Sequence, residues 1–261
     1  MKKKLIIFDM DGTIYLGKDL IDGSLEAFKY LKSNNIDYVF FTNNSSHDLD
    51  FYYNKINEFG IPSNRDKNYY SSVEVTIGYL KDKNIKKIFV IGNKSFKNKL
   101  KSHFELVDKY DPKIKLDGLV CGFSTELVYH ELKDASLYLQ TQDIEFIATN
   151  GDYRCPIEDG LYIPDCGGMI EWLRLATNKK ATILGKPNPE IIYYLAKQFK
   201  CSLDEILVVG DRIYTDILVG VNAKVDTCLV LSGETKLEDL KNYNYKPTHI
   251  INSIKDLKEI L

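Results

Sequence analysis

Asp9 and Asp11 lie two residues apart directly after the short apolar run Leu5–Phe8, and two such carboxylates could perform nucleophilic and acid-base chemistry. Three further polar clusters also follow short apolar runs. They are Thr42-Asn43-Asn44-Ser45-Ser46, Gly185-Lys186-Pro187, and Gly210-Asp211-Arg212 with Asp216 five residues after Asp211. If the runs are strands of a parallel sheet, their carboxyl ends meet at one edge, where such sheets bind ligands. The sequence therefore predicts one crevice that gathers carboxylates, a lysine and a hydroxyl group.

The predicted crevice has the composition of a phosphoryl-transfer site with a divalent cation. Carboxylates held close together repel one another, so a cation must offset them. Oxygen ligands without His or Cys favour Mg²⁺, which commonly binds one or two carboxylates and a phosphate oxygen. Lys186 and the hydroxyl of Thr42 suit the other phosphoryl oxygens. Asp9 is then the candidate nucleophile, forming an aspartyl-phosphate, and Asp11 is the candidate general acid and base.

Each cluster taken alone also has an ordinary structural interpretation. Asp9 and Asp11 could form a turn or cap a helix, and the cluster at Thr42 could be a loop with a helix cap. The residues around Lys186 could be a helix entry, and those around Asp211 a capped helix start. The order of the four clusters, each after an apolar run, favours the chemical interpretation.

Short apolar runs alternate with helical patterns, which predicts an α/β protein with right-handed βαβ units and a mainly parallel sheet. The runs are too short for helices and rich in Ile, Val and Phe. They are Leu5–Phe8, Tyr38–Phe41, Ile88–Ile91, Leu119–Cys121, Phe146–Ala148, Ala181–Leu184, Ile206–Val209, Thr227–Leu231 and Thr248–Ile251. The clearest helical patterns are Ser24–Lys32, Asp48–Phe59 and Glu190–Phe199. Gly60 is expected to end the second of these, and Asn188 to cap the third.

Composition argues against several classes of partner. The chain has 261 residues, with 35 basic and 37 acidic side chains and a net charge of −2, so neither nucleic acid nor an anionic membrane is an expected partner. No window approaches the ~20 apolar residues of a membrane span, and the apolar segment after Lys2–Lys4 is too short for a signal peptide. The five cysteines are widely spread without a CxxC pair, which favours a reducing cytoplasm.

The polar clusters together resemble the four motifs of the haloacid dehalogenase (HAD) superfamily, in the order of that family. The motifs as they stand here are "FDMDGTIYLG", "FFTNNSS", "GKPNPEII" and "VVGDRIYTDI". They are most similar to the NagD-like branch, subclass IIA, which includes 4-nitrophenylphosphatase-like enzymes. The resemblance implies a Rossmann-like, doubly wound parallel sheet with an inserted α/β cap domain of the C2 type. It places the core domain at residues 1–71 and 181–261, and the cap domain at 72–180.

The resemblance also implies a role for each clustered residue. Asp9 is implied as nucleophile and Mg²⁺ ligand, and Asp11 as acid and base with its backbone carbonyl on the metal. Asp211 is implied as a further ligand, and Asp216 as a residue supporting the metal shell. The phosphoryl group is expected to be held by Thr42, Asn43, Asn44 and Lys186. Dehalogenases of the superfamily lack an acid at the position of Asp11, so the resemblance favours hydrolysis of phosphate esters.

Substrate choice is expected to lie in a cap loop at residues 146–169. Its candidate specificity residues are Asn150, Asp152, Arg154 and Cys155. Pyridoxal phosphate phosphatases of the family carry His where this chain has Cys155 before Pro156, which argues against that substrate. Gly167 and Gly168 are expected to precede a helix at Met169–Ala176. They could form a phosphate site at its start or a tight packing turn between cap and core.

The leading hypothesis is a Mg²⁺-dependent phosphatase that hydrolyses small phosphorylated metabolites in the cytoplasm. One alternative is a phosphotransferase or mutase of the same superfamily. Another is a regulatory protein that binds a phosphometabolite without turnover, although such a protein has no use for the leaving-group acid Asp11. A homodimer formed through the cap is a further expectation from relatives.

Overall fold

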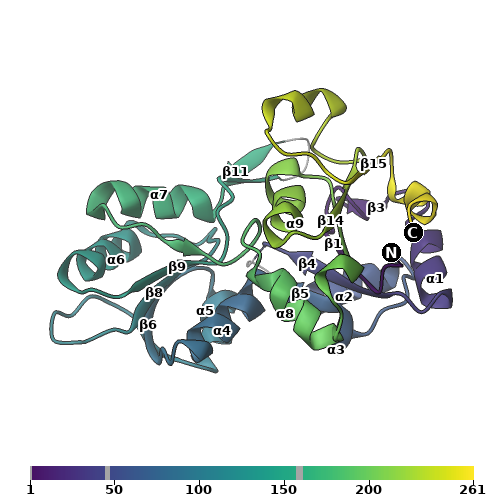
Figure 1. The fold of residues 1–261 in the computed structure, drawn as a ribbon. Helices are drawn as coiled ribbons and strands as arrows, with labels where there is room; N and C mark the ends of the chain where they lie inside the picture. Colours follow the sequence, from purple (N-terminus) through teal and green to yellow (C-terminus); the bar gives the residue numbers. More distant parts are fainter. Residues whose placement is uncertain (1, 45–47, 157–160) are drawn as a thin grey trace. The chain divides into compact units, whose positions relative to one another are not determined.

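The computed structural model describes residues 2–44, 48–156 and 161–261, which form two compact units. The first unit comprises Met1–Thr42, Leu49–Tyr70 and Lys186–Leu261, and the second comprises Asn43–Asp48 and Ser71–Gly185. Each unit is built on its own sheet of parallel strands with helices packed against it (Figure 1). The predicted α/β class with a Rossmann-like parallel sheet is therefore confirmed. Within the described residues, no helix has both the length and the apolar composition needed to cross a bilayer.

The first unit contains a six-stranded sheet in the order β15-β14-β13-β1-β4-β5. Its strands are β1 (Leu5–Phe8), β4 (Asp37–Thr42), β5 (Tyr69–Ser71), β13 (Ile206–Gly210), β14 (Asp226–Val230) and β15 (His249–Ile251). β1 runs parallel to both of its neighbours, with Leu5 opposite Ile206 on one side and Asp37 on the other. Ile6 and Phe8 pack in one core cluster, and the alternate residues of β1 are buried as well. Continuous apolar strands arise because both faces of this sheet are covered.

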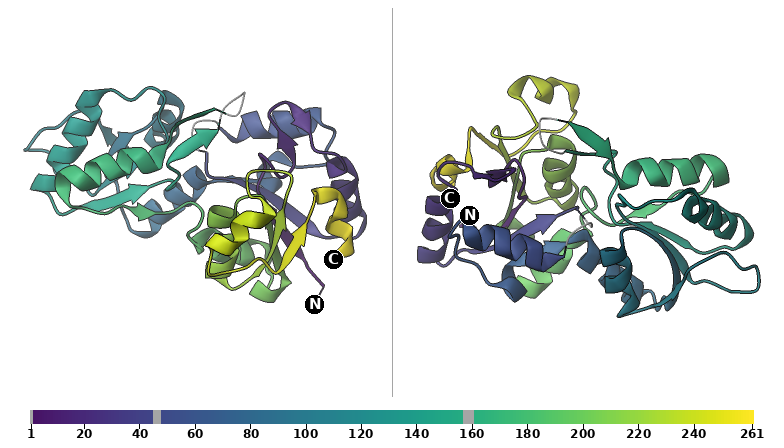
Figure 2. Two further views of the ribbon diagram at one scale, coloured as in Figure 1. Left: turned by 90° about the horizontal axis from the view of Figure 1, so that it is seen from above. Right: turned by 180° about the vertical axis from the view of Figure 1, so that it is seen from behind.

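The helices of the first unit follow from local sequence signals. They are α1 (Ser24–Ser33), α2 (Leu49–Glu58), α3 (Arg65–Asn68), α8 (Glu190–Phe199) and α9 (Leu218–Ala223), and Figure 2 shows them from two further sides. Phe28 and Leu31 on one face of α1 are fully buried. Gly60 follows α2 with φ +74°, a left-handed conformation that ends the helix at low cost. Asn188 Oδ1 accepts the Glu190 amide at 3.0 Å and so caps α8 as predicted.

The unit is completed by a short hairpin of β2 (Tyr15–Leu16) and β3 (Asp19–Leu20), and by short 3₁₀-helical and π-helical turns. The turns span Leu203–Glu205, Ile213–Ile217, Leu237–Asn242 and Ile254–Glu259. The turn at Ile213–Ile217 follows β13 directly and leads into α9, so it holds residues just beyond the carboxyl end of a central strand.

The second unit contains a five-stranded parallel sheet in the order β12-β9-β8-β6-β7. Its strands are β6 (Lys87–Ile91), β7 (Glu105–Val107), β8 (Gly118–Cys121), β9 (Glu145–Ala148) and β12 (Thr182–Ile183). Its helices are α4 (Ser72–Asp82), α5 (Lys94–Lys101), α6 (Tyr129–Thr141) and α7 (Cys166–Thr177). α4 and α5 pack on one face of the sheet, and α6 and α7 on the other. A separate antiparallel hairpin joins β10 (Arg154–Pro156) to β11 (Tyr162–Pro164).

Two sequence predictions about this unit need correction. The run Ala181–Leu184 was expected in the core sheet, but Thr182 and Ile183 pair with Ile147 and Ala148 of β9. The boundary between the units accordingly falls after Gly185, and residues 43–48 group with the second unit as well. An apolar run indicates a buried strand but not the sheet to which the strand belongs, so the sequence could not assign Ala181–Leu184 to a sheet.

The helix expected at Met169–Ala176 begins earlier, at Cys166, so Gly167 and Gly168 lie inside its first turn. Asp165 provides the cap, because its Oδ1 accepts the Cys166 amide at 2.5 Å. A Cβ on Gly167 would lie 2.5 Å from the Gly151 carbonyl oxygen, so glycine is needed for close packing of α7 on the loop at 151–152. This packing of Gly167 lies within the second unit and differs from the predicted packing turn between cap and core, while a phosphate site at the start of the helix stays a prediction.

Candidate active site

Residues of all four polar clusters reach the carboxyl edge of the six-stranded sheet, three of them directly from its strands. Asp9 follows β1, Thr42 is the last residue of β4, and Asp211 follows β13. Asp216 lies in the helical turn Ile213–Ile217, one turn beyond Asp211. Lys186 begins the last segment of the first unit and reaches the same edge. The parallel arrangement of the strands thus gathers residues that are about 200 positions apart in the chain.

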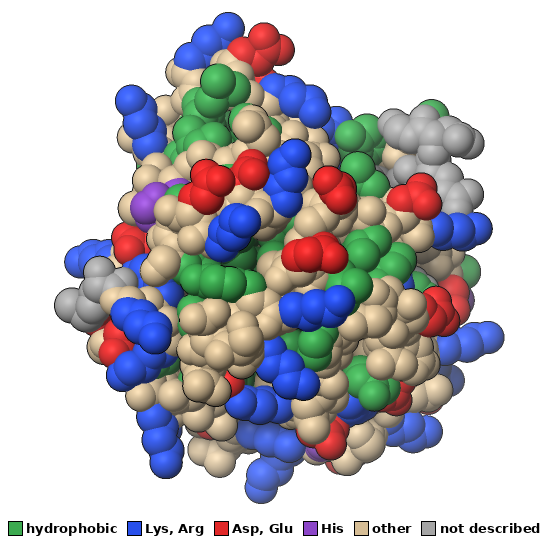
Figure 3. Space-filling view, turned by 90° about the vertical axis from the view of Figure 1, so that its right-hand side faces the viewer, with side chains coloured by type: hydrophobic (Ala, Val, Ile, Leu, Met, Phe, Trp, Pro, Cys, Tyr) green, Lys and Arg blue, Asp and Glu red, His purple; other side chains and the backbone are tan. Residues whose placement is uncertain are grey.

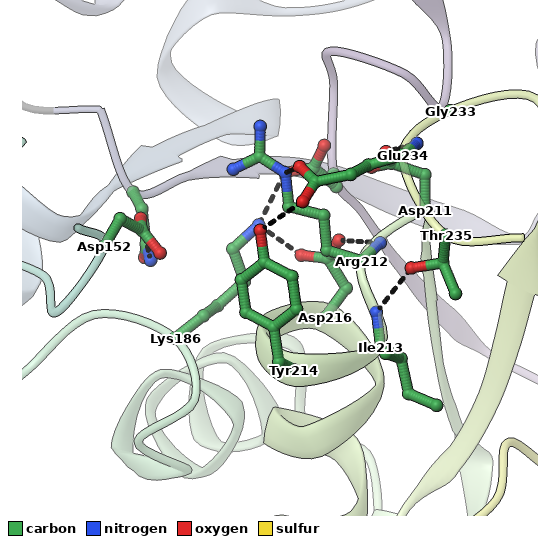
Figure 4. Close-up of polar contacts among 12 residues, drawn as sticks. Asp152, Lys186, Asp211, Arg212, Ile213, Tyr214, Asp216, Gly233, Glu234 and Thr235 are labelled. Carbon is green, nitrogen blue, oxygen red and sulfur yellow. Dashed lines mark hydrogen bonds and ion pairs between the residues drawn. The ribbon is translucent and has the colours of Figure 1, made fainter. Parts of the chain in front are cut away.

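Asp9, Asp211 and Asp216 form a tight carboxylate cluster. One ligand oxygen from each lies within 4.8 Å of the others. The Lys186 ammonium lies 2.7 Å from Asp216 Oδ1 (Figure 4). It also lies 2.5 Å from Asp9 Oδ1 and donates to the Phe41 carbonyl at 3.3 Å. Lys186, Asp211 and Asp216 are almost completely buried. A buried lysine therefore joins two of the three carboxylates.

The electrostatics of the cluster show a shortage of positive charge. Burial raises the pKa of Asp9 to about 6, although the Lys186 ammonium acts in the opposite direction. Burial, together with the charges of Asp9 and Asp216, also holds the pKa of Asp211 well above its ordinary value. Burial by itself would lower the pKa of Lys186, but Asp216 and Asp9 raise it overall. A further cation would stabilise the ionised carboxylates.

Asp211 offers the clearest position for such a cation. Its Oδ2 accepts the Glu234 amide at 2.7 Å. Its Oδ1 is buried, and no described residue forms a hydrogen bond with it. A buried carboxylate oxygen without a partner is costly unless a ligand satisfies it. With only oxygen donors in the cluster, the residues present fit a hard divalent cation such as Mg²⁺.

Asp11 differs from the cluster because it is exposed. It is followed by Gly12, which has φ +85° and donates its amide to the Tyr15 carbonyl at 2.8 Å. A Cβ on Gly12 would lie 2.5 Å from Asp211 Oδ2. Glycine is thus required both for the left-handed turn and for the close approach of the Asp11 segment to Asp211.

Asn43 is fixed by a hydrogen-bond network inside the second unit. Its Nδ2 donates to Asp152 Oδ2 at 3.0 Å. Its carbonyl accepts Asn150 Nδ2 at 3.0 Å and Ser72 Oγ at 2.9 Å. Two of the predicted specificity residues, Asn150 and Asp152, therefore hold a predicted phosphate-binding residue. Asn44 is half-buried, and the adjoining Ser45 and Ser46 lie outside the described residues.

Arg154 and Cys155 lie on β10, in the hairpin with β11. The Arg154 guanidinium carbon lies 4.3 Å from the centroid of the Tyr162 ring, so the side chain stacks on the other strand of its own hairpin. Of the four predicted specificity residues, Asn150 and Asp152 thus contact Asn43, and Arg154 and Cys155 belong to the hairpin.

Sequence reasoning assigned no role to Arg212 and Glu234, which lie beside the carboxylate cluster. Arg212 Nε is 3.1 Å from Glu234 Oε2, and the Glu234 amide binds Asp211. The signal for Arg212 was its position directly after Asp211, since an arginine next to a carboxylate site can bind an anion. Glu234 follows the apolar end of β14 in an ordinary loop, and its sequence context contains no comparable signal.

Comparisons with known proteins agree with this geometry. A family model described as haloacid dehalogenase-like hydrolase matches residues 6–103, and a second HAD-hydrolase-like model matches residues 183–257. The chain is 30% identical to 5'-nucleotidase YutF of Bacillus subtilis over 96% of this chain and 95% of that protein. The crystal structure of 4-nitrophenylphosphatase from Thermotoga maritima is similar with a TM-score of 0.90 and 35% identity, covering 98% of this chain and 97% of that one. NagD from E. coli is similar with a TM-score of 0.88 and 26% identity, covering 98% of each chain.

The fold, the carboxylate edge and these relatives define a phosphoric monoester hydrolase. The chain belongs to the haloacid dehalogenase-like hydrolases, in the group that contains NagD and the 4-nitrophenylphosphatases.

Proposed function

We propose that the protein is a Mg²⁺-dependent phosphatase that hydrolyses small phosphorylated metabolites through an aspartyl-phosphate on Asp9. The main support is the meeting of Asp9, Asp211 and Asp216 around a common point, with the Lys186 ammonium 2.5 Å from Asp9. Mg²⁺ would be held by Asp9, Asp211 and the backbone carbonyl of Asp11, with Asp216 in support. When bound, it would neutralise the carboxylates and draw charge from the phosphoryl oxygens.

In the proposed reaction, a carboxylate oxygen of Asp9 attacks phosphorus and the ester bond to the leaving oxygen breaks. Asp11 donates its proton to that oxygen, so the product leaves as an alcohol. Asp11 then takes a proton from water, which attacks phosphorus and releases inorganic phosphate and Asp9. Thr42, Asn43, Asn44 and Lys186 are the proposed residues for holding the phosphoryl group. The exposure of Asp11 suits a group that must exchange protons with leaving group and solvent.

We expect phosphate release to require Mg²⁺ and Mg²⁺ affinity to fall as the pH falls through about 6, because burial raises the pKa of Asp9 to about that value. Protons compete with the metal for the carboxylates below this pH, so for each proton displaced the Mg²⁺ affinity should fall about tenfold per pH unit. Titration calorimetry between pH 5 and 8 would measure the Mg²⁺ affinity, and phosphate release would be assayed with and without EDTA. A pH-independent affinity would contradict the proposed metal ligand, and Mg²⁺-independent turnover would contradict the proposed function.

The second unit, residues 72–180 in the sequence prediction, is proposed to be the cap domain that selects the substrate. The relatives are named for 5'-nucleotides, sugar phosphates and 4-nitrophenyl phosphate. Nucleotides and sugar phosphates are therefore the first physiological candidates. Asn150 and Asp152 are proposed to act through Asn43, which they bind, whereas Arg154 and Cys155 would act from the β10–β11 hairpin. A screen of phosphorylated metabolites would identify the preferred class.

Two other functions remain as alternatives to be separated by experiment. A phosphotransferase would pass the phosphoryl group to an added sugar acceptor faster than to water. A regulatory protein would bind a phosphometabolite and release no phosphate. Measuring inorganic phosphate and phosphorylated acceptor in one assay distinguishes all three outcomes.

The proposed partner is a small phosphorylated molecule in the cytoplasm, without nucleic acid or membrane. On the face drawn in Figure 3, side chains of both charges are intermixed, as the net charge of −2 suggests. No two of the five cysteines, all within the described part of the chain, form a disulfide, which suits a reducing compartment.

A homodimer formed through the second unit is a further proposal, supported by exposed apolar side chains on α6 and α7. Tyr129, Trp172 and Leu175 are 81%, 61% and 69% exposed. Trp172→Glu is expected to convert a dimer to a monomer in light scattering, because the charge would have to be buried at the interface. Lys86→Glu, at an exposed residue just before β6 in the same unit, is the control for added acidic charge. A monomeric wild-type protein would contradict the proposal.

A further inference from the structure

The guanidinium group of Arg212 is largely buried beside the carboxylate cluster and only partly bonded. Its side chain is 20% exposed, and Nε lies 3.1 Å from Glu234 Oε2. The Nη1 and Nη2 groups have no hydrogen-bond or ion-pair partner among the described residues. Nε is buried and completes no hydrogen bond with a described residue beyond this ion pair, so Nη1 and Nη2 carry the donors that a ligand could reach.

The charge of Arg212 acts directly on the reacting end of the site. Burial by itself would lower the pKa of Arg212, but Asp9, Asp211 and Asp216 raise it overall, with Asp9 the largest contributor of the three. Arg212 in turn lowers the pKa of Asp9. These effects agree with the geometry, since Figure 4 shows the Arg212 side chain beside Lys186, Asp211 and Asp216.

Contacts from the loop after β14 position Arg212. Glu234 pairs with Arg212 through Oε2 and accepts the Tyr214 hydroxyl on Oε1 at 2.7 Å (Figure 4). The Glu234 amide binds Asp211 Oδ2, and Thr235 Oγ1 accepts the Ile213 amide at 3.0 Å. The loop after β14 therefore contacts both Asp211 and Arg212, and it holds the Nε end of the guanidinium group beside the carboxylate cluster.

Lys186 cannot bind all the oxygens of a phosphoryl group. Its ammonium already contacts Asp9, Asp216 and the Phe41 carbonyl, which occupies the three donors of a lysine. The planar fork of an arginine matches two phosphate oxygens at once.

We propose that Arg212 is a further catalytic residue, whose Nη groups bind oxygens of the transferred phosphoryl group, and that Glu234 and Tyr214 position it. This inference rests on the proposed phosphatase function and adds to it the residue that neutralises the phosphoryl oxygens. Lys186 would then chiefly orient Asp9 and Asp216. The positioning residues would act only through the direction in which the guanidinium points.

The test compares Arg212→Gln, Arg212→Lys and Glu234→Gln with the wild type, using inorganic phosphate as the probe in the presence of Mg²⁺. Titration calorimetry is expected to show phosphate binding weakened at least about tenfold in Arg212→Gln, because a bidentate charged contact is lost. kcat/KM for 4-nitrophenyl phosphate should fall by roughly 100-fold or more. Arg212→Lys keeps the charge but not the planar guanidinium group, so its phosphate affinity and kcat/KM should lie between those of Arg212→Gln and the wild type. Glu234→Gln should lower both quantities by less than Arg212→Gln does.

Mg²⁺ affinity without phosphate separates this role from a structural one. Removing a positive charge near Asp9 and Asp211 should leave Mg²⁺ affinity unchanged or higher, whereas a collapsed site would lose it. Arg65→Gln is the matched control, because Arg65 Nε also pairs with a carboxylate, Asp50, at 2.7 Å. It should bind phosphate like the wild type.

Wild-type phosphate affinity in Arg212→Gln would overturn the proposal, as would a loss confined to substrates with a second acidic group. If Arg212→Gln does not fold, the phosphate affinities of Arg212→Lys and Glu234→Gln test the proposal instead, and wild-type affinity in both would overturn it. A wild-type protein that binds phosphate but hydrolyses no ester would contradict the proposed function, and the binding comparison would still report on Arg212.

Discussion

Asp9→Asn is expected to lower kcat for 4-nitrophenyl phosphate by at least about 10⁴-fold while the fold is retained. The amide is a far poorer nucleophile than the carboxylate, and it removes one of the oxygens proposed to bind Mg²⁺. The fold should survive because Asn has nearly the same shape. Burial raises the pKa of Asp9 to about 6, above its ordinary value, so its contribution to stability is present at low pH and lost as the pH rises through about 6. Above that pH, the neutral Asn avoids the cost of a buried charge.

Steady-state kinetics and circular dichroism of the purified variant would check this result. Asp66→Asn is a suitable control, since Asp66 is 87% exposed on α3 in the same unit. The control should have wild-type kcat and KM. A folded Asp9→Asn protein with more than a few per cent of wild-type activity would exclude Asp9 as the nucleophile.

Lys186→Met is expected to lower both turnover and stability. The ammonium is 5% exposed and pairs with Asp9 and Asp216, so its removal leaves two buried carboxylates without their cation. Breaking a buried ion pair from one side typically costs about 3–5 kcal/mol of unfolding free energy. Turnover should fall by roughly 100-fold or more, because the charge that orients Asp9 is lost. Methionine keeps most of the volume of lysine, so packing changes little.

Urea unfolding monitored by fluorescence and circular dichroism would give the stability change, with kinetics measured in parallel. Lys179→Met is the matched control, because Lys179 pairs at 3.3 Å with Asp143, which is fully exposed. That surface pair should contribute at most about 1 kcal/mol. The assignment fails if Lys186→Met unfolds at the wild-type urea concentration in metal-free buffer. Saturating Mg²⁺ should recover part of the lost stability, because the metal replaces the missing positive charge.

Local sequence signals determined the secondary structure and the four polar clusters. The helix predicted at Glu190–Phe199 has these bounds in the structure, because a cap, a proline and an apolar face all lie within adjacent residues. The strand Leu5–Phe8 was likewise readable from a run of four apolar residues. The structure brings Asp9, Asp211 and Asp216 together, as the rule for parallel strand ends predicted, whereas Lys186 joins them after a strand of the other sheet.

Only the tertiary structure determined which residues that are distant in sequence contact one another. It placed Thr182–Ile183 in the second sheet, joined Asn43 to Asp152, and set Glu234 against Arg212. Strand pairing and side-chain contacts across many residues depend on the packing of whole elements, which no window of local sequence contains. The sequence by itself thus determined the fold class and the chemical groups at the sheet edge. Packing determined which groups neutralise, orient and support them.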